Sequence, residues 1–359
     1  MKATYNVLIL GASYGSLLGA KLLLAGHDVT VVCRAANAEV INRVGVRIRL
    51  PVSWKTELLE IDSRELPGTL TAATPNAIDP RQFDLVALAM QEPQYCQAGV
   101  RELLDAIALA NVPCMSIMNM PPPPYLERIP NLDVAALGAC YTDASVWKNF
   151  DSACMTLCSP DPQAFRPSEE EPNILHVTLP TNFKAARFDS NEHTEMLRRM
   201  QAHIAVSRYH DVELPVKLKV SDSIFVPLAK WPMLITGNYR CVQADGARPI
   251  RDAVHSDAET SHSVYQWVCD LCIELGASPT DLVPFEKYAA AAQELVNPSS
   301  ASRALFDGAT NIERVDRLVQ AIAVQKGLQS SVVDEIVTLV DARLKLNRES
   351  ETERALLSA

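Results

Sequence analysis

The stretch that decides the fold is residues 5–34, which read YNVLILGASYGSLLGAKLLLAGHDVTVVCR. It opens with a short apolar run that favours a β-strand and ends at Gly11. Apolar residues then recur from Leu17 to Leu24 in a pattern that suits a helix, and Gly26 suits its C-terminal cap. The run DVTVVCR predicts a second buried strand. Strand, glycine turn, helix and strand within about thirty residues are typical of one βαβ unit.

Apolar runs continue to alternate further along the chain. Residues 83–90 (FDLVALAM) and 112–119 (VPCMSIMN) predict buried strands, and residues 100–110 (VRELLDAIALA) predict an amphipathic helix between them. From about residue 190 the pattern becomes mainly helical. We therefore expect an α/β fold: an N-terminal Rossmann domain with a doubly wound parallel sheet, followed by a C-terminal domain that is mainly α-helical.

These changes of pattern place the expected boundaries. The Rossmann domain should span residues 1–188 and the helical domain residues 189–347, and the charged tail over residues 348–359 should fray. Residues 159–173 (SPDPQAFRPSEEEPN) are polar and rich in proline, so they predict an exposed loop within the first domain.

Composition narrows the class of protein. The chain has 359 residues and a formal net charge of −10, which argues against a nucleic-acid partner because such proteins carry a basic face. Nine cysteines at irregular spacings predict reduced thiols and a cytoplasmic protein. Cys269 and Cys272 fall in a helical pattern, which favours two core residues over a metal or redox pair. The opening run MKATYNVLIL is too short to span a membrane and lacks a cleavage pattern.

The turn after the first strand carries the strongest chemical signal. A dinucleotide pyrophosphate needs backbone N–H groups at a helix N-terminus and residues without Cβ where the chain approaches it. The usual spacing is GxGxxG, whereas residues 11–16 read GASYGS, one residue shorter and with serine at the middle glycine. A glycine turn without a ligand is the alternative. The flanking strand and helix favour a nucleotide-binding turn made of Gly11, Ser13, Tyr14, Gly15 and Ser16.

The residue at the end of the second strand bears on the choice of cofactor. An acidic residue there would hold the ribose hydroxyl of NAD, whereas an arginine can pair with the 2′-phosphate of NADP. The strand ends in Arg34, and no acidic residue follows it directly. We therefore expect NADP as the cofactor, with an ordinary solvated arginine as the alternative.

At this point the chain resembles the ketopantoate reductase family. The resemblance rests on LILGASYGSLLGAKLLLAGHDVTVVCR, DLVALAM and SIMN in the first half, and on LAKWPMLITGN and SSASRALFDGATNIERVDRLVQAIAVQKGL in the second. It implies a fold like that of 6-phosphogluconate dehydrogenase, with the helical domain binding substrate and forming a homodimer. It also implies hydride transfer from NADPH to a 2-oxo acid, with a lysine of the helical domain as proton donor.

Carried over residue by residue, the resemblance implies a set of site residues. Lys230 would be the proton donor, although a shifted alignment would place Pro227 there. Asn119 ends a strand and would hold nicotinamide or substrate. Asn238, eight residues after the lysine, would bind substrate or act catalytically. The family's pair of substrate-binding serines corresponds to Ser299 and Ser300.

Each of these residues also has a structural alternative. Lys230 could be a surface lysine, Asn238 could end a helix, and the serines after Asn297-Pro298 could cap one. The chain also departs from the family pattern: Gln91 stands where the family has a lysine, and the helix motif reads Thr310-Asn311-Ile312-Glu313, so its acid survives only at Glu313. Gln91 and Glu313 are kept as cofactor-binding candidates, and Glu313 could also orient the lysine.

Three functions remain open at this stage. The first is an NADPH-dependent reductase of a 2-oxo acid or related ketone. The second is an opine-type dehydrogenase that reduces an imine, and the third is a regulator that binds NADP(H) without catalysis. No metal is expected, because His255 and His262 lack a third ligand at convincing spacing.

Overall fold

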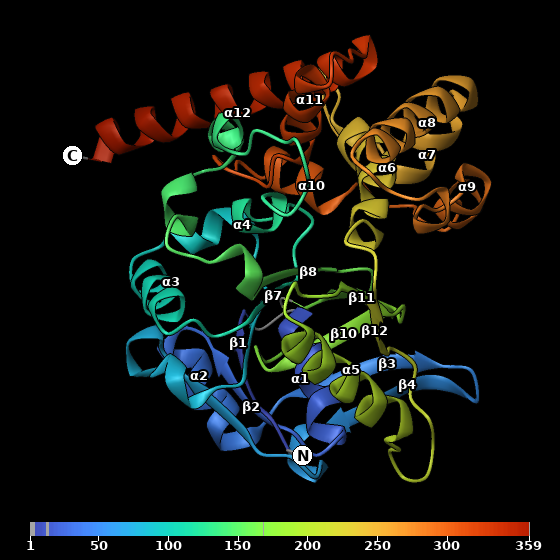
Figure 1. Ribbon diagram of the computed structural model, residues 1–359. Coiled ribbons are helices and arrows are strands. Elements are labelled where there is room, and N and C mark those ends of the chain that lie inside the picture. Colours follow the sequence, from blue (N-terminus) through green and yellow to red (C-terminus); the bar gives the residue numbers. More distant parts are fainter. Residues whose placement is uncertain (1–3, 12–13, 168, 359) are drawn as a thin grey trace. The chain divides into compact units, whose positions relative to one another are not determined.

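The computed structural model describes residues 4–11, 14–167 and 169–358, and the side chains of all of these except Tyr14, Leu357 and Ser358. The chain forms two compact units (Figure 1). The first contains residues 1–128 and 145–227, and the second contains residues 129–144 and 228–359. This division differs from the domain bounds predicted from the sequence, 1–188 and 189–347, which stay a prediction for the functional domains.

The main sheet of the first unit is the doubly wound sheet expected from the sequence. Its strand order is β12-β11-β8-β7-β6-β1-β2-β5, and the six strands β5, β2, β1, β6, β7 and β8 run parallel to one another. The edge strand pair is added through β11, which is antiparallel to β8. The strands are β1 (Asn6–Leu10), β2 (Asp28–Val32), β5 (Leu70–Ala73), β6 (Leu85–Leu88), β7 (Cys114–Ser116), β8 (Met155–Ser159), β11 (Phe183–Ala186) and β12 (Leu218–Ser221).

A second, four-stranded sheet was not expected from the sequence. Its order is β4-β3-β10-β9, formed by β3 (Arg47–Val52), β4 (Lys55–Asp62), β9 (Gln163–Phe165) and β10 (Ile174–Leu179). In β3 buried and half-buried residues alternate, as expected for a strand with one covered face. Strand β9 lies inside residues 159–173, so the segment predicted as an exposed loop contributes an edge strand.

Helices of the first unit share a core with both sheets. Helices α1 (Tyr14–Leu24) and α5 (Asn191–Val206) lie side by side (Figure 1), and their apolar faces join residues from both sheets in one buried cluster. The other helices of the unit are α2 (Ala35–Val44), α3 (Val100–Leu109) and the short α4 (Pro123–Leu126). Gly26 has φ +81°, which confirms the glycine end predicted for the first helix.

The second unit is helical, as predicted. Its helices are α6 (Trp231–Met233), α7 (Ile250–His255), α8 (Ala258–Glu274), α9 (Phe285–Ala292), α10 (Ser300–Phe306), α11 (Val315–Gln325) and α12 (Ser331–Ser358). Helix α12 runs to Ser358, so the structure places the charged tail up to this residue in a helix, and fraying of that end stays a prediction. Cys269 and Cys272 are buried free thiols on α8, which confirms their predicted place in the core.

One stretch of the second half differs from its predicted form. The sequence pattern is mainly helical from about residue 190, but β12 ends only at Ser221 and a 3-10 turn follows at Val226–Lys230. After α6, residues Leu234–Asn238 form a π-helical turn. The proline at position 232 fits this break because it lacks the N–H that an α-helix interior needs.

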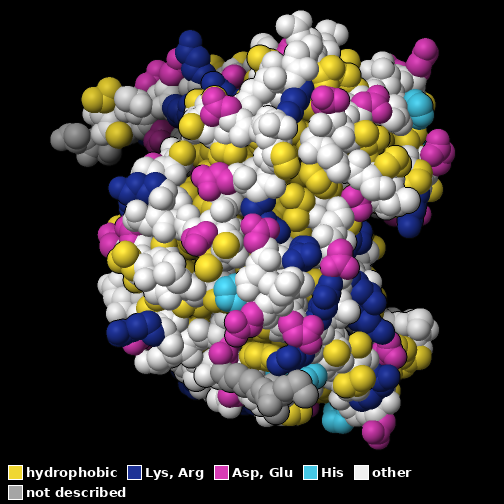
Figure 2. Space-filling view, viewed as in Figure 1, with side chains coloured by type: hydrophobic (Ala, Val, Ile, Leu, Met, Phe, Trp, Pro, Cys, Tyr) yellow, Lys and Arg dark blue, Asp and Glu magenta, His cyan; other side chains and the backbone are white. Residues whose placement is uncertain are grey.

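Two further features are the distribution of charged side chains and the hydropathy of the helices. Figure 2 shows acidic and basic side chains interspersed over the face in view. None of the described helices is both long enough and apolar enough to cross a membrane.

Candidate functional site

At two positions of the turn between β1 and α1, the surrounding atoms leave no room for a side chain. Gly11 has φ +105°, and a Cβ there would lie 2.6 Å from the carbonyl oxygen of Ala89, just beyond β6. A Cβ on Gly15 would lie 2.4 Å from Cγ2 of Ile9 in β1. Gly15 therefore lets α1 close onto the strand, as one glycine of a dinucleotide turn does. Ser13 lies outside the described residues, as does the side chain of Tyr14.

Arg34 lies two residues beyond the end of β2, as the residue that precedes α2, rather than as the last residue of the strand. Its backbone is extended and its side chain is exposed. No hydrogen bond or ion pair joins this side chain to the residues that the structure describes. The guanidinium is therefore available to solvent or to an anion.

Arg166 is a second cation beside the glycine turn, and sequence reasoning missed it. Its Nη2 donates a hydrogen bond to Oγ of Ser16, 3.2 Å away in the first turn of α1. Burial lowers the pKa of Arg166, and the thiol of Cys33 at the end of β2 is close enough to oppose that shift. Arg166 thus lies near both parts of the unit where phosphate groups were expected. Its only signal in the sequence was the run AFR in a segment that looked like loop.

Two predicted residues follow strand ends of the main sheet. Gln91 is exposed and caps the 3-10 turn Glu92–Cys96 that follows β6, where its N–H donates to Oε1 of Gln94 at 3.0 Å. Asn119 is half-buried three residues beyond β7. Because the carboxyl ends of parallel strands share one edge of a sheet, both residues lie at the edge that also carries the glycine turn.

In the second unit, the π-helical turn brings Lys230 and Asn238 onto one helix face. Eight residues of regular α-helix would leave them about 80° apart around the axis. A π turn adds one residue, so the pair is separated by the rotation of about seven, roughly 20° short of two turns. Burial agrees, because Lys230, Met233 and Asn238 are half-buried while every other residue from 228 to 241 is buried.

A glycine and a tyrosine support this π turn. The hydroxyl of Tyr288 in α9 donates to the carbonyl of Met233 at 3.1 Å, at the start of the turn. A Cβ on Gly237 would lie only 2.0 Å from that hydroxyl oxygen. Gly237 therefore leaves the space in which Tyr288 reaches the helix backbone.

The predicted substrate serines have different positions. Ser299 is buried, and its Oγ accepts from the N–H of Ser302 as the N-cap of α10. The same hydroxyl donates to the carbonyl oxygen of Asn238 at 2.7 Å. Ser300 is exposed in the first turn of the helix. Ser299 thus fixes the backbone of Asn238, and the capping alternative describes what its hydroxyl does in this structure.

Glu313 is joined to the same region through its backbone. It is buried, and its carbonyl accepts a 2.5 Å hydrogen bond from the hydroxyl of Tyr239, the residue after Asn238. That hydroxyl in turn accepts from the N–H of Val315 at 3.1 Å. The motif around Glu313 is held further by Arg314, which bonds the buried carboxylate of Asp316 through Nε and Nη2.

The structure therefore assembles two groups of the predicted residues. Gly11, Gly15 and Ser16 meet in the first unit together with Arg166, and Gln91 and Asn119 share their sheet edge. Lys230, Asn238, Ser299 and Glu313 belong to one part of the second unit. The described residues contain no group of His, Cys, Asp and Glu that could hold a metal ion. His255 bonds the carbonyl of Ala289 at 3.0 Å, which is a structural role.

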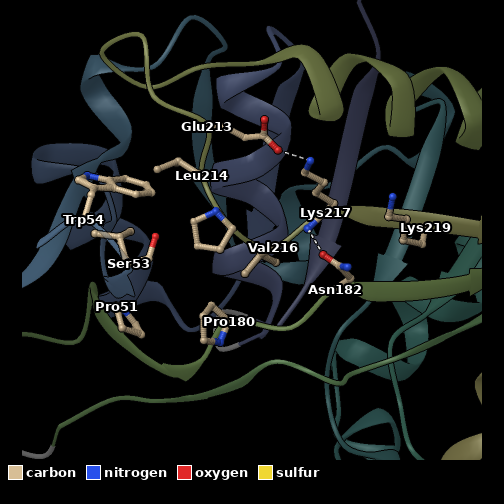
Figure 3. A pocket seen from close by; sticks show the side chains of 12 residues that line it. Pro51, Ser53, Trp54, Pro180, Asn182, Glu213, Leu214, Val216, Lys217 and Lys219 are labelled. Atoms are coloured by element: carbon tan, nitrogen blue, oxygen red, sulfur yellow. Dashed lines mark hydrogen bonds and ion pairs between the residues drawn. The ribbon is translucent and has the colours of Figure 1, made fainter. Parts of the chain in front are cut away.

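A separate groove of about 590 Å³ is also present in the first unit (Figure 3). It is lined by residues of the β3–β4 turn, the β10–β11 turn and the segment that leads into β12. No candidate residue named above lines it.

Comparison with known proteins adds information on the fold alone. No protein-family model matches the chain, and no curated protein matches it. The chain is similar in structure to 2-dehydropantoate 2-reductase from Methylococcus capsulatus, with a TM-score of 0.66, 13% identity, and coverage of 94% of this chain and 97% of that one. It is also similar to a D-mandelate dehydrogenase in complex with NADH and anilino(oxo)acetate (TM-score 0.63, 12% identity, coverage 96% and 99%).

A dimeric ketopantoate reductase from Staphylococcus aureus gives the same picture, with a TM-score of 0.56, 10% identity, and coverage of 95% and 99%. Each similarity extends over nearly the whole of both chains, so it includes both units. The chain therefore has the fold of the ketopantoate reductases, and the resemblance noted in its sequence is confirmed at the level of the fold.

Proposed function

We propose that the chain is an NADPH-dependent reductase of a 2-oxo acid or a related ketone, similar to the ketopantoate reductases. The observation that carries the proposal is the fold, shared over nearly the whole chain with a 2-dehydropantoate reductase and with a dehydrogenase bound to NADH and an oxo-acetate. These two proteins act on or bind carbonyl compounds that carry a carboxylate. The same substrate class is the one we assign here.

The residues of the first unit fit a dinucleotide. Gly11 and Gly15 permit the close approaches that such a turn needs, and Ser16 lies in the first turn of α1, where backbone N–H groups favour an anion. Arg166 adds a cation at this point, and Arg34 adds one at the end of β2. The nicotinamide ring, when bound, supplies the hydride. We assign the pyrophosphate to the glycine turn and the 2′-phosphate to Arg34 and Arg166.

The second unit supplies the acid and the substrate contacts. An oxyanion that develops on a carbonyl oxygen requires a nearby positive charge and a proton. Nζ of Lys230 is the group we assign to both tasks. Asn238 lies on the same helix face and would orient the carbonyl or the carboxylate, with its backbone fixed by Ser299. Asn119 would position nicotinamide or substrate from the first unit.

The test is a screen of NADPH oxidation by the full chain. The substrates are a panel of 2-oxo acids that includes ketopantoate, together with simple ketones, each with and without an added amine. Turnover of an oxo acid without amine is expected. Turnover that requires the amine would indicate an imine reductase instead, and NADPH binding without turnover of any compound would indicate a binding protein and contradict the proposal.

We further propose a homodimer formed through the helical second unit, as the family resemblance implies. The similar ketopantoate reductase from Staphylococcus aureus is described as dimeric. Sedimentation at micromolar concentration should then give about twice the chain mass of 39.4 kDa. A single species at the chain mass would contradict this part of the proposal.

A further inference from the structure

The groove in the first unit has two chemically different ends. Figure 3 shows Trp54 at one end and Lys219 at the other, with Val216 and Lys217 between them. Its volume of about 590 Å³ is in the range of small-molecule sites. No described residue of the glycine turn lines it, so the groove is separate from the cofactor site proposed above.

The apolar end is built around an exposed indole. Trp54 is 51% exposed, whereas Trp147 and Trp231 are almost fully buried. It lies at the turn of the β3–β4 hairpin, and the rings of Pro51 and Pro215 line the same groove. An exposed indole beside proline rings offers a flat apolar wall, a surface that a ligand with a planar apolar body would cover.

The other end carries an excess of positive charge. Lys217 bonds the carboxylate of Glu213, and Arg208 contacts the same carboxylate at 3.2 Å, so one acid is shared by two cations. Lys219 is exposed and forms no ion pair with any residue in the described part of the chain. Such a local excess stands out in a chain with a net charge of −10. Charge complementarity therefore favours an anionic group at this end.

The segment of residues 215–217 forms one wall of the groove. A buried cation bonds it, and it contains a residue in a strained backbone conformation. Nζ of Lys21, on α1, is almost fully buried and donates to the carbonyl of Pro215 at 3.3 Å. Val216 is buried at φ +68°, a region that a β-branched residue rarely adopts. The N–H of Lys217 is fixed by Oδ1 of Asn182 at 2.8 Å. Backbone strain of this kind persists where surrounding contacts enforce it, and it concentrates at ligand sites.

We propose that this groove binds a small organic anion. Its planar apolar body lies against Trp54 and Pro215, and its carboxylate or sulfonate is met by Lys217 and Lys219. The shape and the charge of the groove both enter this assignment. An apolar surface patch would lack the cations, and a general basic patch would lack the indole wall.

The probe for the test is 8-anilinonaphthalene-1-sulfonate, a planar aromatic anion, titrated into the full chain in saturating NADPH so that the cofactor site is occupied. We expect saturable binding that weakens with salt. Trp54→Ala should weaken it on the order of tenfold, through loss of the aromatic wall. The double variant Lys217→Gln, Lys219→Gln should weaken it several-fold, by about the value of two exposed charge contacts.

Two controls make the result decisive. Lys184→Gln removes a lysine of the neighbouring strand β11 that pairs with Asp161 and does not line the groove, so binding should not change. N-phenyl-1-naphthylamine has the same planar body without the sulfonate and should bind more weakly than the anion. Equal binding by Trp54→Ala and wild type, equal binding of the neutral compound, or loss of binding in NADPH would overturn the proposal.

Discussion

Two turns of this molecule, one in each unit, depend on a glycine in the same way. Gly15 lets helix α1 approach Ile9 of β1, and Gly237 lets Tyr288 approach the π-helical turn. The first pair lies six positions apart along the chain, within one βαβ unit. In the second, the bond from Tyr288 to Met233 joins residues 55 positions apart. The same packing requirement is therefore visible in a sequence only when the two residues that pack together are close in the chain.

The two cations near the glycine turn repeat this contrast. Arg34 lies two residues after β2 and could be assigned from the strand pattern. Arg166 directly follows β9 of the second sheet and reaches Ser16, 150 positions away along the chain. Neither β9 nor its sheet had a signal in the sequence strong enough to place Arg166 beside the turn.

The largest effect is expected on turnover, from substitution of Lys230 on the helix face that also carries Asn238. Lys230→Ala should lower turnover of the substrate found in the screen by about 10²–10⁴-fold, because it removes the proton donor. NADPH affinity should stay unchanged, since Lys230 is assigned to the substrate carbonyl and the phosphate contacts are assigned to the first unit. Lys230→Arg should restore little, because a guanidinium does not readily release a proton.

Lys287→Ala is the matched control for this experiment, because Lys287 is an exposed lysine of the same unit on α9. It should turn over at the wild-type rate. If Lys230→Ala does so as well, the shifted alignment with Pro227 is the better one and the proton comes from elsewhere.

A second test measures how the stability of the first unit depends on pH. The ring of His27 is fully buried: its Nδ1 accepts from the N–H of Tyr5 at 3.2 Å, and its Nε2 faces Nδ1 of His203 at 3.2 Å. Burial, with a smaller contribution from His203, lowers the pKa of His27 from 6.5 to about 4. The unfolded chain therefore binds more protons than the folded one between these values, so stability should fall as the pH drops from about 6.5 to about 4.

The expected loss at pH 4 is about 2–3 kcal/mol, the free energy that corresponds to this pKa shift. Urea unfolding between pH 4 and 7 would measure it, followed by a probe confined to the first unit, such as amide exchange of β1. His27→Gln cannot titrate and should show a flatter pH dependence. The same slope in both proteins would assign the loss to other groups.

A third test compares the local and the distant arginine. Arg166→Ala and Arg34→Ala should each weaken NADPH binding by about 1.5–3 kcal/mol, the value of a charge-assisted contact to phosphate. Arg34→Ala should also reduce the preference for NADPH over NADH, which wild type is expected to show. Titration of both cofactors measures these changes.

Arg81→Ala is the control for both variants, because Arg81 is exposed in the same unit and pairs only with the nearby Asp79 among the described residues. It should leave both affinities unchanged. If Arg166→Ala also binds NADPH as wild type does, the arginine only anchors the β9–β10 hairpin. A wild-type preference for NADH would remove the basis of the NADP assignment.

The smallest expected effects come from the two glycines themselves. Gly15→Ala and Gly237→Ala should each destabilise the protein by about 1–3 kcal/mol through overpacking. Beyond stability, Gly15→Ala should weaken cofactor binding, and Gly237→Ala should slow turnover by moving Asn238 against Lys230. Tyr288→Phe in the Gly237→Ala background removes the clashing hydroxyl and should recover part of the loss. Identical effects of the two glycine variants on cofactor binding would break the comparison.

The elements of the fold that depend on short-range patterns could be predicted from the sequence alone. The βαβ unit of residues 5–34, the buried strands at 83–90 and 112–119 and the helical second half all follow from hydrophobic periodicity and glycine placement, and the structure has them. The glycine turn to which we assign the cofactor could be predicted for the same reason. A strand, a turn and a helix that are contiguous in the chain place their ligand-facing atoms by local geometry.

Features that depend on contacts between residues far apart in the chain are visible only in the tertiary structure. Arg166 directly follows a strand of the four-stranded sheet and contacts Ser16, and Ser299 fixes the Asn238 carbonyl, so both depend on segments 60 to 150 positions apart. The π turn that aligns Lys230 with Asn238 is a helix geometry that no local pattern specifies. The same holds for the groove at Trp54, whose wall joins the β3–β4 turn to the segment before β12. Periodicity tells which face of an element is buried, and it does not tell which other element buries it.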